Sequence, residues 1–435
     1  MEKVIIHDGV EFTLKDGTLL KMNHKGNVWD VTIPKELPTG DKIQTIAANF
    51  CDGYYKTIVI DNSISKISSK AFKQAYVSSV VWPTACTEIP EECFCGSSLS
   101  SISGINSVVK VGASAFEATS LEEIRWPDNC AAIPKRCFAH CTFLETISNI
   151  DNVTDIQECA FMRAKVTNFI WPSACKTIPA RCFEISELKA ISNIDHVTCV
   201  GESAFCDSLL KKIKWPSACE VIPEFCFTSS TLSSITNMKN VEEIQVGAFA
   251  GTRINKFNWP GKCKAIPTRC FEGSNLKFIC GTDNVEEIGE EAFRACKLES
   301  FVWPSGCKTM PEECFHACYI KTISNVENVE KIGERAFGNS MIVSFTWPSK
   351  CKTIPEGCFR DSELEFISGT KDVEEIEDSA FSRCRKLKVF TWPAGCNIIP
   401  AQCFEQSGLE IITGIGAVEK IEKDAFNECE FTPPI

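Results

Sequence analysis

A repeat of about 22 residues constrains the fold of this chain more than any other feature of its sequence. Two consecutive copies lie between Leu298 and Phe337, and in both of them apolar or small residues fall at offsets 0, 3, 5, 9, 12, 16 and 17. These positions are Leu298, Phe301, Trp303, Cys307, Met310, Cys314 and Phe315 in the first copy, and Ile320, Ile323, Asn325, Val329, Ile332, Ala336 and Phe337 in the second. Such a repeat is typical of stacked coils that share one continuous core.

The same offsets recur from Val28 to Phe426 without a linker, which predicts one elongated repeat domain instead of several globular ones. Counting the phenylalanines that close the repeats, from Phe50 onward, gives about 18 coils of 22–23 residues over residues 28–429.

The two ends of the chain depart from the repeat. Residues 1–27 hold a Lys-Asp-Gly turn at 15–17 between apolar segments, which predicts a hairpin that caps the first coil. Residues 430–435 are predicted to form a C-terminal tail.

Each coil is predicted to combine a strand with a turn. Its opening, such as Leu210–Trp215, alternates like a short β-strand and is followed by proline. Its closing segment, such as Ile89–Phe94, has proline and then acidic residues, as in the first turn of a helix. We therefore predict a right-handed solenoid with one long parallel β-sheet on its concave face and short helical turns or loops on its convex face.

Two kinds of coil alternate from residue 77 onward. One kind has tryptophan at offset 5, and these residues are Trp82, Trp126, Trp171, Trp215, Trp259, Trp303, Trp347 and Trp392. The other kind has glycine or asparagine there, namely Gly104, Asn149, Asn193, Asn237, Gly281, Asn325, Gly369 and Gly414. We interpret the indoles as core, with a stacking platform for sugars or bases as the alternative. The small residues either leave room for the indole or turn the chain with positive φ.

Twenty-seven cysteines raise the question of metal ions and disulfides. Sixteen fall in two columns where the next coil has valine or alanine, which favours buried core thiols over zinc or disulfide use. Cysteines of one column lie two coils apart, about 9–10 Å, which is too far for a disulfide. Cys296 and Cys318 are different, because both follow a phenylalanine by three residues in adjacent coils. They are the best candidates for a disulfide, and no metal or cofactor is predicted.

Charge and motifs exclude several classes of function. The formal net charge of −12 disfavours nucleic acid as a partner. No apolar run approaches the roughly 18–20 residues of a membrane span. The 5 histidines are scattered, and no nucleophile elbow, P-loop or metal-spaced histidine cluster occurs, so we do not expect an enzyme.

A protein partner is expected on the outward side chains of the strands, at offsets 2 and 4, which vary from coil to coil. Simple solvation of this face is the alternative reading for any one residue. The candidate partner-binding residues are Arg125, Ile170, Lys212, Lys214, Lys256, Phe278, Val302, Phe366, Val389 and Ile411. The three lysines form a basic cluster that suits an acidic partner, and no oligomeric state is predicted.

The repeat resembles the BspA-like leucine-rich repeat family. Ile288–Cys296 (IGEEAFRAC), Ile421–Cys429 (IEKDAFNEC) and Val31–Pro34 (VTIP) carry the likeness. Tryptophan before the proline, and cysteine in place of valine and alanine in alternate coils, depart from the family pattern. The resemblance implies a leucine-rich-repeat solenoid without enzymatic activity. It further implies a surface or secreted adhesin of a host-associated bacterium or parasitic protist, which binds host matrix proteins or other cells.

Two other functions stay open. The start of the chain lacks the features of a signal peptide and thiols are abundant, which favours a cytoplasmic scaffold or effector that binds a protein partner. A thiol-rich metal store is the third possibility.

Overall fold

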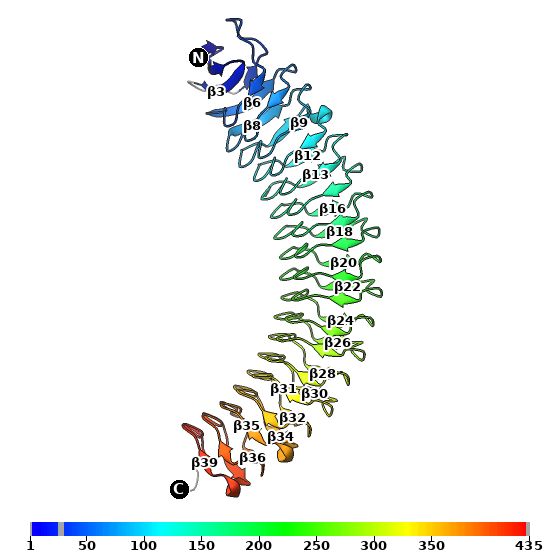
Figure 1. Ribbon diagram of the computed structural model, residues 1–435, viewed down its shortest axis with the longest axis vertical. Helices are drawn as coiled ribbons and strands as arrows, with labels where there is room; N and C mark the ends of the chain where they lie inside the picture. The colour runs from blue at the N-terminus through cyan, green and yellow to red at the C-terminus, as the bar shows by residue number, and fades with distance from the viewer. Residues whose placement is uncertain (1, 25–29, 432–435) are drawn as a thin grey trace. The chain divides into compact units, whose positions relative to one another are not determined.

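The computed structural model describes residues 2–24 and 30–431. The chain divides into two compact units, residues 1–218 and 219–435. Each unit is a solenoid in which short parallel strands are stacked coil upon coil (Figure 1). Val28, with which we expected the first coil to open, lies outside the described residues, as does most of the expected C-terminal tail.

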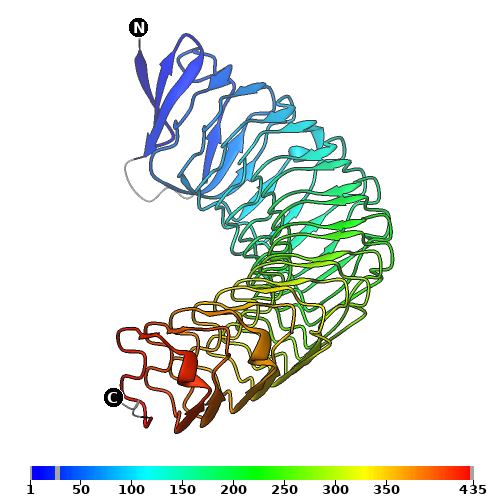
Figure 2. The ribbon, with the colours of Figure 1, turned by 60° about the horizontal axis from the view of Figure 1, so that its bottom comes forward.

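The first unit begins with an antiparallel meander of β1 (Lys3–His7), β2 (Val10–Lys15) and β3 (Thr18–His24), which is seen at the N-terminus in Figure 2. The two turns are Asp8-Gly9 and Asp16-Gly17, and all four residues have positive φ, as type I′ hairpin turns require. Strand β3 continues in parallel with β5 of the first coil. The pairing of β3 with β5 therefore joins the meander to the first coil by backbone hydrogen bonds.

From β4 onward, the even-numbered strands make the first column, in which the middle residue of each three-residue strand points inward and its neighbours point outward. In the first unit they are β4 (Asp30–Ile33), β6 (Tyr54–Ile60), β8 (Tyr76–Val81), β10 (Ser101–Ser103), β12 (Glu123–Arg125), β14 (Thr146–Ser148), β16 (Asn168–Ile170), β18 (Ala190–Ser192) and β20 (Lys212–Lys214). In the second they are β22 (Ser234–Thr236), β24 (Lys256–Asn258), β26 (Phe278–Cys280), β28 (Ser300–Val302), β30 (Thr322–Ser324), β32 (Ser344–Thr346), β34 (Phe366–Ser368), β36 (Val389–Thr391) and β38 (Ile411–Thr413).

This column is not one unbroken sheet. After the four-stranded sheet β4–β6–β8–β10, each strand that precedes a tryptophan pairs with the strand of the next coil, as in β12–β14 and β36–β38. The ladder is therefore interrupted after every second coil.

From β5 onward, the odd-numbered strands make a second column, which the sequence did not predict. Each has two residues, of which the second is apolar. In the first unit they are β5 (Thr45–Ile46), β7 (Lys66–Ile67), β9 (Glu88–Ile89), β11 (Lys110–Val111), β13 (Ala132–Ile133), β15 (Asp155–Ile156), β17 (Thr177–Ile178) and β19 (Cys199–Val200). In the second they are β21 (Val221–Ile222), β23 (Glu243–Ile244), β25 (Ala265–Ile266), β27 (Glu287–Ile288), β29 (Thr309–Met310), β31 (Lys331–Ile332), β33 (Thr353–Ile354), β35 (Glu375–Ile376), β37 (Ile398–Ile399) and β39 (Lys420–Ile421).

The closing segments are consecutive β-turns and not the helical turns expected from their proline and acidic residues. In the segment from Pro90, the Cys93 N–H donates to the Pro90 carbonyl (3.2 Å), and Glu92 has a φ of 51°. A positive φ at the third residue of a turn is the type II geometry and cannot continue as a helix. The Phe94 N–H donates to Ala115 in the next coil (2.8 Å), so these turns are satisfied between coils.

The described helices are three short 3₁₀ turns, η1 (Ile105–Ser107), η2 (Thr370–Asp372) and η3 (Ile415–Ala417). Over residues 2–24 and 30–431, no helix has the length and apolar character needed to cross a membrane.

A stack of phenylalanine rings forms the spine of the core. The closing rings from Phe50 to Phe404 are 0% exposed. Within each unit, neighbouring rings of this stack lie 4.9–6.0 Å apart between centroids, and nearly all of these pairs are parallel. Dispersion and apolar burial along this stack hold successive coils together.

The eight repeat tryptophans are core residues, at most 2% exposed. As seen at Trp82, Trp126 and Trp392, the indole Nε1–H donates to the backbone carbonyl of the cysteine four residues later, over 2.7–3.1 Å. This bond satisfies the one polar group that burial of an indole would leave unpaired.

Glycine and asparagine in the alternate coils turn the chain with positive φ, the second of the two interpretations given above. Gly104 has a φ of 77°, and a Cβ atom there would lie 2.4 Å from the Trp82 carbonyl oxygen. Asn149 has a φ of 63°, and its Nδ2 donates to the Trp126 carbonyl (2.7 Å). Either residue places the backbone close to the preceding tryptophan.

Candidate functional site

The outward side chains of the first column form two rows, which we call the strand face. Side chains alternate between the two sides of a strand, so the first and third residues of each three-residue strand point away from the core. Neighbouring strands are paired in register, with Val389 opposite Ile411 and Thr391 opposite Thr413. Residues at one position in the two strands of a pair therefore lie side by side.

Three successive coils of the second unit place large apolar side chains in the first of these rows. Phe366 on β34 is 68% exposed, and Val389 on β36 and Ile411 on β38 are each 53% exposed. The rings that close the two coils beginning at β34 and β36, Phe381 and Phe404, stack 5.4 Å apart between centroids. We call Phe366, Val389 and Ile411 the apolar row.

Hydroxyl groups fill the second row beside it. The side-chain oxygens of Thr346 and Ser368 lie 3.2 Å apart, and the Thr413 hydroxyl donates to the Thr391 hydroxyl over 3.2 Å. These groups bond to one another and still have lone pairs open to solvent.

The other border of the apolar row is charged and internally paired. Lys386 Nζ lies 3.0 Å from a Glu363 carboxylate oxygen and 3.4 Å from one of Glu365. Lys388 Nζ lies 2.7 Å from Glu410. The hydrogen bond to Glu363 raises the pKa of Lys386, and that to Glu410 raises the pKa of Lys388. The border therefore carries little uncompensated charge beside the apolar side chains.

A second group of outward-facing side chains lies on β24, β26 and β28. The Lys256 ammonium is 5.7 Å from the centroid of the exposed Phe278 ring, within reach of a cation–π contact. Cys280, also exposed, has its Sγ 3.4 Å from Asn258 Oδ1. Val302 is exposed in the coil that follows.

The candidate residues of the first unit are not gathered into one site. Arg125 pairs with Asp128 (2.8 Å), and Ile170 is exposed beside Ser192 on the neighbouring strand.

The expected basic cluster is divided between the two units. Lys212 and Lys214 belong to the first unit and Lys256 to the second. Lys214 Nζ lies 2.9 Å from an Asp195 carboxylate oxygen, which compensates its charge.

Sequence reasoning missed an exposed aromatic pair near the start of the first unit. Tyr54 and Tyr76 face each other across β6 and β8, and their rings stack with centroids 4.6 Å apart. Their separation of one repeat length was the signal that could have revealed them.

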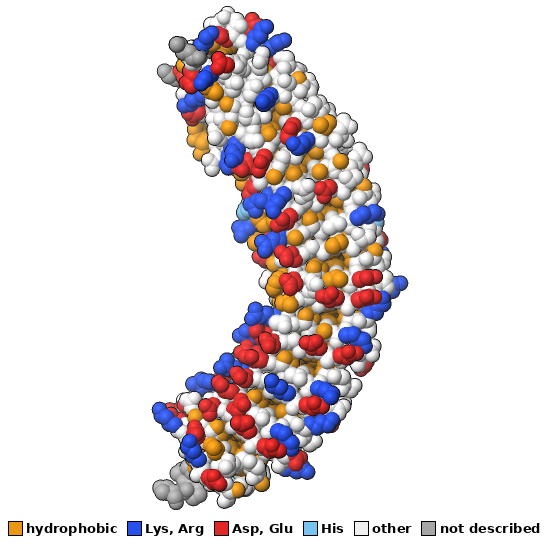
Figure 3. All heavy atoms as spheres, in the orientation of Figure 1, with side chains coloured by type: hydrophobic (Ala, Val, Ile, Leu, Met, Phe, Trp, Pro, Cys, Tyr) orange, Lys and Arg blue, Asp and Glu red, His pale blue; other side chains and the backbone are white. Residues whose placement is uncertain are grey.

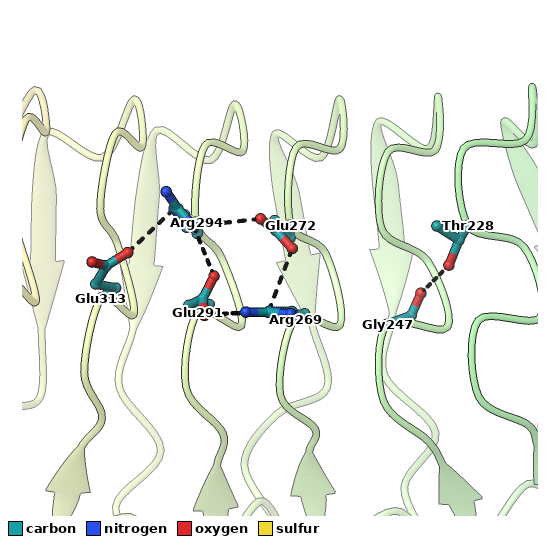
Figure 4. A network of polar contacts seen from close by, with 7 residues as sticks. All are labelled: Thr228, Gly247, Arg269, Glu272, Glu291, Arg294 and Glu313. Atoms are coloured by element: carbon teal, nitrogen blue, oxygen red, sulfur yellow. Dashed lines mark hydrogen bonds and ion pairs between the residues drawn. The ribbon is translucent and has the colours of Figure 1, made fainter.

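An ionic network lies on the turn edge of the second unit (Figure 4). Arg294 Nη1 lies 2.9 Å from Glu291 and 3.7 Å from Glu272, and its Nε lies 3.3 Å from Glu313. Arg269 reaches Glu291 over 2.8 Å, and this hydrogen bond is the main cause that lowers the pKa of Glu291. Glu291 has a φ of 56° in a β-turn, where a helical turn was expected, and it is held by arginines of its own and the preceding coil.

Acidic and basic side chains are interspersed over the second unit on the face seen in Figure 3, without a broad basic area.

The two cysteine columns are buried. Burial raises the pKa of thiols such as Cys314 and Cys270 well above the usual range, so they are protonated and unreactive. Cys296 and Cys318 are also buried, and their sulfur atoms are 3.6 Å apart. Among the described residues, no group of three or more histidine, cysteine, aspartate or glutamate side chains could hold a metal ion.

Comparison with known proteins identifies the repeat. A family model described as a BspA type leucine rich repeat region of 6 copies matches residues 65–189, 154–277, 198–321 and 308–432. The crystal structure of a leucine-rich repeat protein from Bacteroides ovatus is similar with a TM-score of 0.53 and 18% identity, over 94% of this chain and 99% of that one. This similarity supports the fold alone.

Two further solved structures resemble the chain more distantly. A leucine rich cell surface protein from Faecalibacterium prausnitzii has a TM-score of 0.39 and 18% identity, over 97% of this chain and 94% of that one. The pneumococcal vaccine antigen PcpA has a TM-score of 0.37 and 15% identity, over 95% and 98%. No curated protein matches the chain.

Proposed function

Since the chain belongs to the BspA-type leucine-rich repeat family, we propose that it is a non-enzymatic solenoid that binds a protein partner through its strand face. Leucine-rich repeat proteins typically bind proteins, and a solenoid offers an extended surface for this purpose.

The apolar row carries this proposal. Phe366, Val389 and Ile411 are each more than half exposed, and they occupy the same position in three successive strands of the first column. Covering an apolar side chain of this size contributes about 1.5–3 kcal/mol, so covering the exposed halves of all three would contribute roughly 3–5 kcal/mol. Hydroxyls on one side and ion pairs on the other provide the polar rim that protein interfaces commonly have.

The finer part of the proposal concerns the partner. We assign to it a protein of the host matrix or of another cell, met at the cell surface or after secretion, as the family suggests. The acidic net charge of −12 and the compensation of Lys214 by Asp195 favour a protein over a polyanion.

The experiment is a binding assay with the labelled full chain on intact host cells and on wells coated with extracellular matrix extract. Replacing Phe366, Val389 and Ile411 by serine keeps the strands hydroxylated like their neighbours and removes the apolar contacts. We expect saturable binding of the parent chain and a loss of at least about tenfold in the triple variant, which corresponds to 1.4 kcal/mol or more.

The matched control is Met341→Ser, since Met341 is also apolar and exposed in the second unit but lies outside the strand face. This variant should bind like the parent. Unchanged binding by the triple variant would contradict the role of the apolar row, and absence of any saturable binding would contradict the adhesive function.

An intracellular scaffold or effector is the second candidate, and the cysteines favour it. All 27 are free thiols in this structure, which suits a reducing compartment. Protease treatment of intact cells of the native organism separates the two candidates, because only a surface protein would be degraded.

A further inference from the structure

The position three residues after each closing phenylalanine forms another column of the solenoid, and small side chains occupy it. In many coils this position is serine or threonine, and in several of these coils the hydroxyl donates to the phenylalanine carbonyl. Examples are Ser186 to Phe183 (2.7 Å) and Thr252 to Phe249 (2.8 Å).

Some coils have cysteine in this column, and the neighbouring coil then usually has a hydroxyl. The sulfur–oxygen distances are 3.4 Å for Thr119 and Cys141, 3.6 Å for Ser362 and Cys384, and 3.5 Å for Ser407 and Cys429. Only at residues 296 and 318 of this column do two adjacent coils both have cysteine.

We propose that Cys296 and Cys318 are an oxidation site, at which a low-molecular-weight disulfide converts the two thiols into a disulfide that joins adjacent coils.

The geometry of the pair suits this bond. The sulfur atoms are 3.6 Å apart, so they are in contact but not bonded. The backbones are held in register because the Tyr319 N–H donates to the Cys296 carbonyl (3.2 Å). Parallel coils at the usual strand spacing of about 4.8 Å fall within the roughly 4.4–6.8 Å that disulfides require between Cα atoms. Small side-chain rotations can therefore bring the sulfurs to bonding distance.

The chemistry is a pair of thiol–disulfide exchanges. One cysteine, as its thiolate, attacks a sulfur of R–S–S–R and releases one R–S⁻, which takes up the proton that the cysteine lost. The second cysteine attacks the mixed disulfide and releases the second thiol, so two cysteine thiols and one R–S–S–R yield one protein disulfide and two R–SH.

Because both cysteines are buried, this reaction requires the coils to open locally. Cys296 and Cys318 are at most 1% exposed, and burial raises the pKa of Cys318 well above the usual range. Both sulfurs are therefore protected while the coils are closed, and exchange requires local opening. Once formed, the bond would tie the segment before β28 to the segment before β30 and restrict their separation in the unfolded chain.

The test exposes the reduced full chain to oxidised glutathione at mild temperature, alkylates the remaining thiols in denaturant and digests with trypsin. The expected product joins residues 295–297 to residues 309–321 and disappears on reduction. The second fragment also contains Cys314, so fragment ions must locate the bond on Cys318. Cys314→Ala, which introduces the residue found at this position in neighbouring coils, should keep the cross-link.

Cys296→Ser removes one of the two thiols. The variant should fold, because serine is the common residue of this column, and it should give no cross-link. Ser362→Cys is the matched gain variant, because it recreates the same arrangement beside Cys384.

A second measurement reads the consequence for stability. Oxidation should raise the thermal midpoint of the parent chain by roughly 4 °C and leave that of Cys296→Ser unchanged. The proposal is overturned if Cys296 and Cys318 stay alkylatable after oxidation, if each instead accumulates its own mixed disulfide, or if the bond is found on Cys314.

Discussion

The phenylalanine stack provides the sharpest test of how this solenoid is held together. Phe293 is fully buried, and its ring stacks on Phe271 (6.0 Å) and Phe315 (5.5 Å) and tilts against Phe301 (5.1 Å). Phe293→Ala should therefore destabilise the folded chain by about 3–5 kcal/mol, the usual cost of truncating a buried aromatic side chain. Each lost ring–ring contact accounts for about 0.5–1.5 kcal/mol of this sum.

The control is Phe366→Ala, which removes the same atoms from a ring that is 68% exposed. Its effect on the free energy of unfolding should stay within about 0.5 kcal/mol. Urea unfolding followed by tryptophan fluorescence measures both changes, and amide hydrogen exchange locates them. Since each coil contacts only its neighbours, lost protection in Phe293→Ala should be concentrated in the coils next to residue 293. Equal unfolding midpoints for the two variants would refute the idea that the closing rings form the spine.

Two further predictions follow from the backbone and from the ionic network. Gly369 has a φ of 77°, and a Cβ there would meet the Trp347 carbonyl oxygen at 2.6 Å, whereas a Cβ at Gly273 (φ 63°) has no atom within 4 Å. Gly369→Ala should cost more than about 2 kcal/mol and Gly273→Ala about 1 kcal/mol in chemical unfolding, and equal costs would show that the close approach is unimportant. Arg269 lowers the pKa of Glu291, so this pair contributes stability above the usual glutamate pKa of about 4.3 and loses it as the pH falls through the lower folded value. Between about pH 5 and 3 the unfolding midpoint should fall more steeply for the parent chain than for Glu291→Gln, and parallel slopes would contradict this.

The architecture could be predicted because every coil must fill the same cross-section. Residues such as Leu298 and Phe301 recur at fixed offsets, and the same logic placed Phe366, Val389 and Ile411 outward. The second strand column was missed because a two-residue strand such as Thr309–Met310 is too short to show alternation. The β-turns were missed because their positive φ falls on ordinary residues such as Glu291, with no glycine to signal it.

In the candidate site, the sequence predicts the direction of the side chains but not their contacts. The offset of a residue within the repeat indicates whether its side chain faces outward, but it does not indicate which side chain of a neighbouring coil it contacts. The pairing of Lys214 with Asp195 and the placement of Lys256 over Phe278 depend on side-chain reach between coils. Asp195 thus compensates the charge of Lys214, and the Lys256 ammonium lies over an aromatic ring.

The alternation of tryptophan coils with glycine or asparagine coils limits how such a chain can grow or shrink. Trp126 has its carbonyl bonded by Asn149 of the next coil, and the strands before these two residues form a ladder of their own. Duplicating a single coil would place two tryptophans, or two glycine or asparagine residues with positive φ, in adjacent coils. A tandem of two coils is therefore the smallest module that can be duplicated, deleted or transplanted with its interior intact.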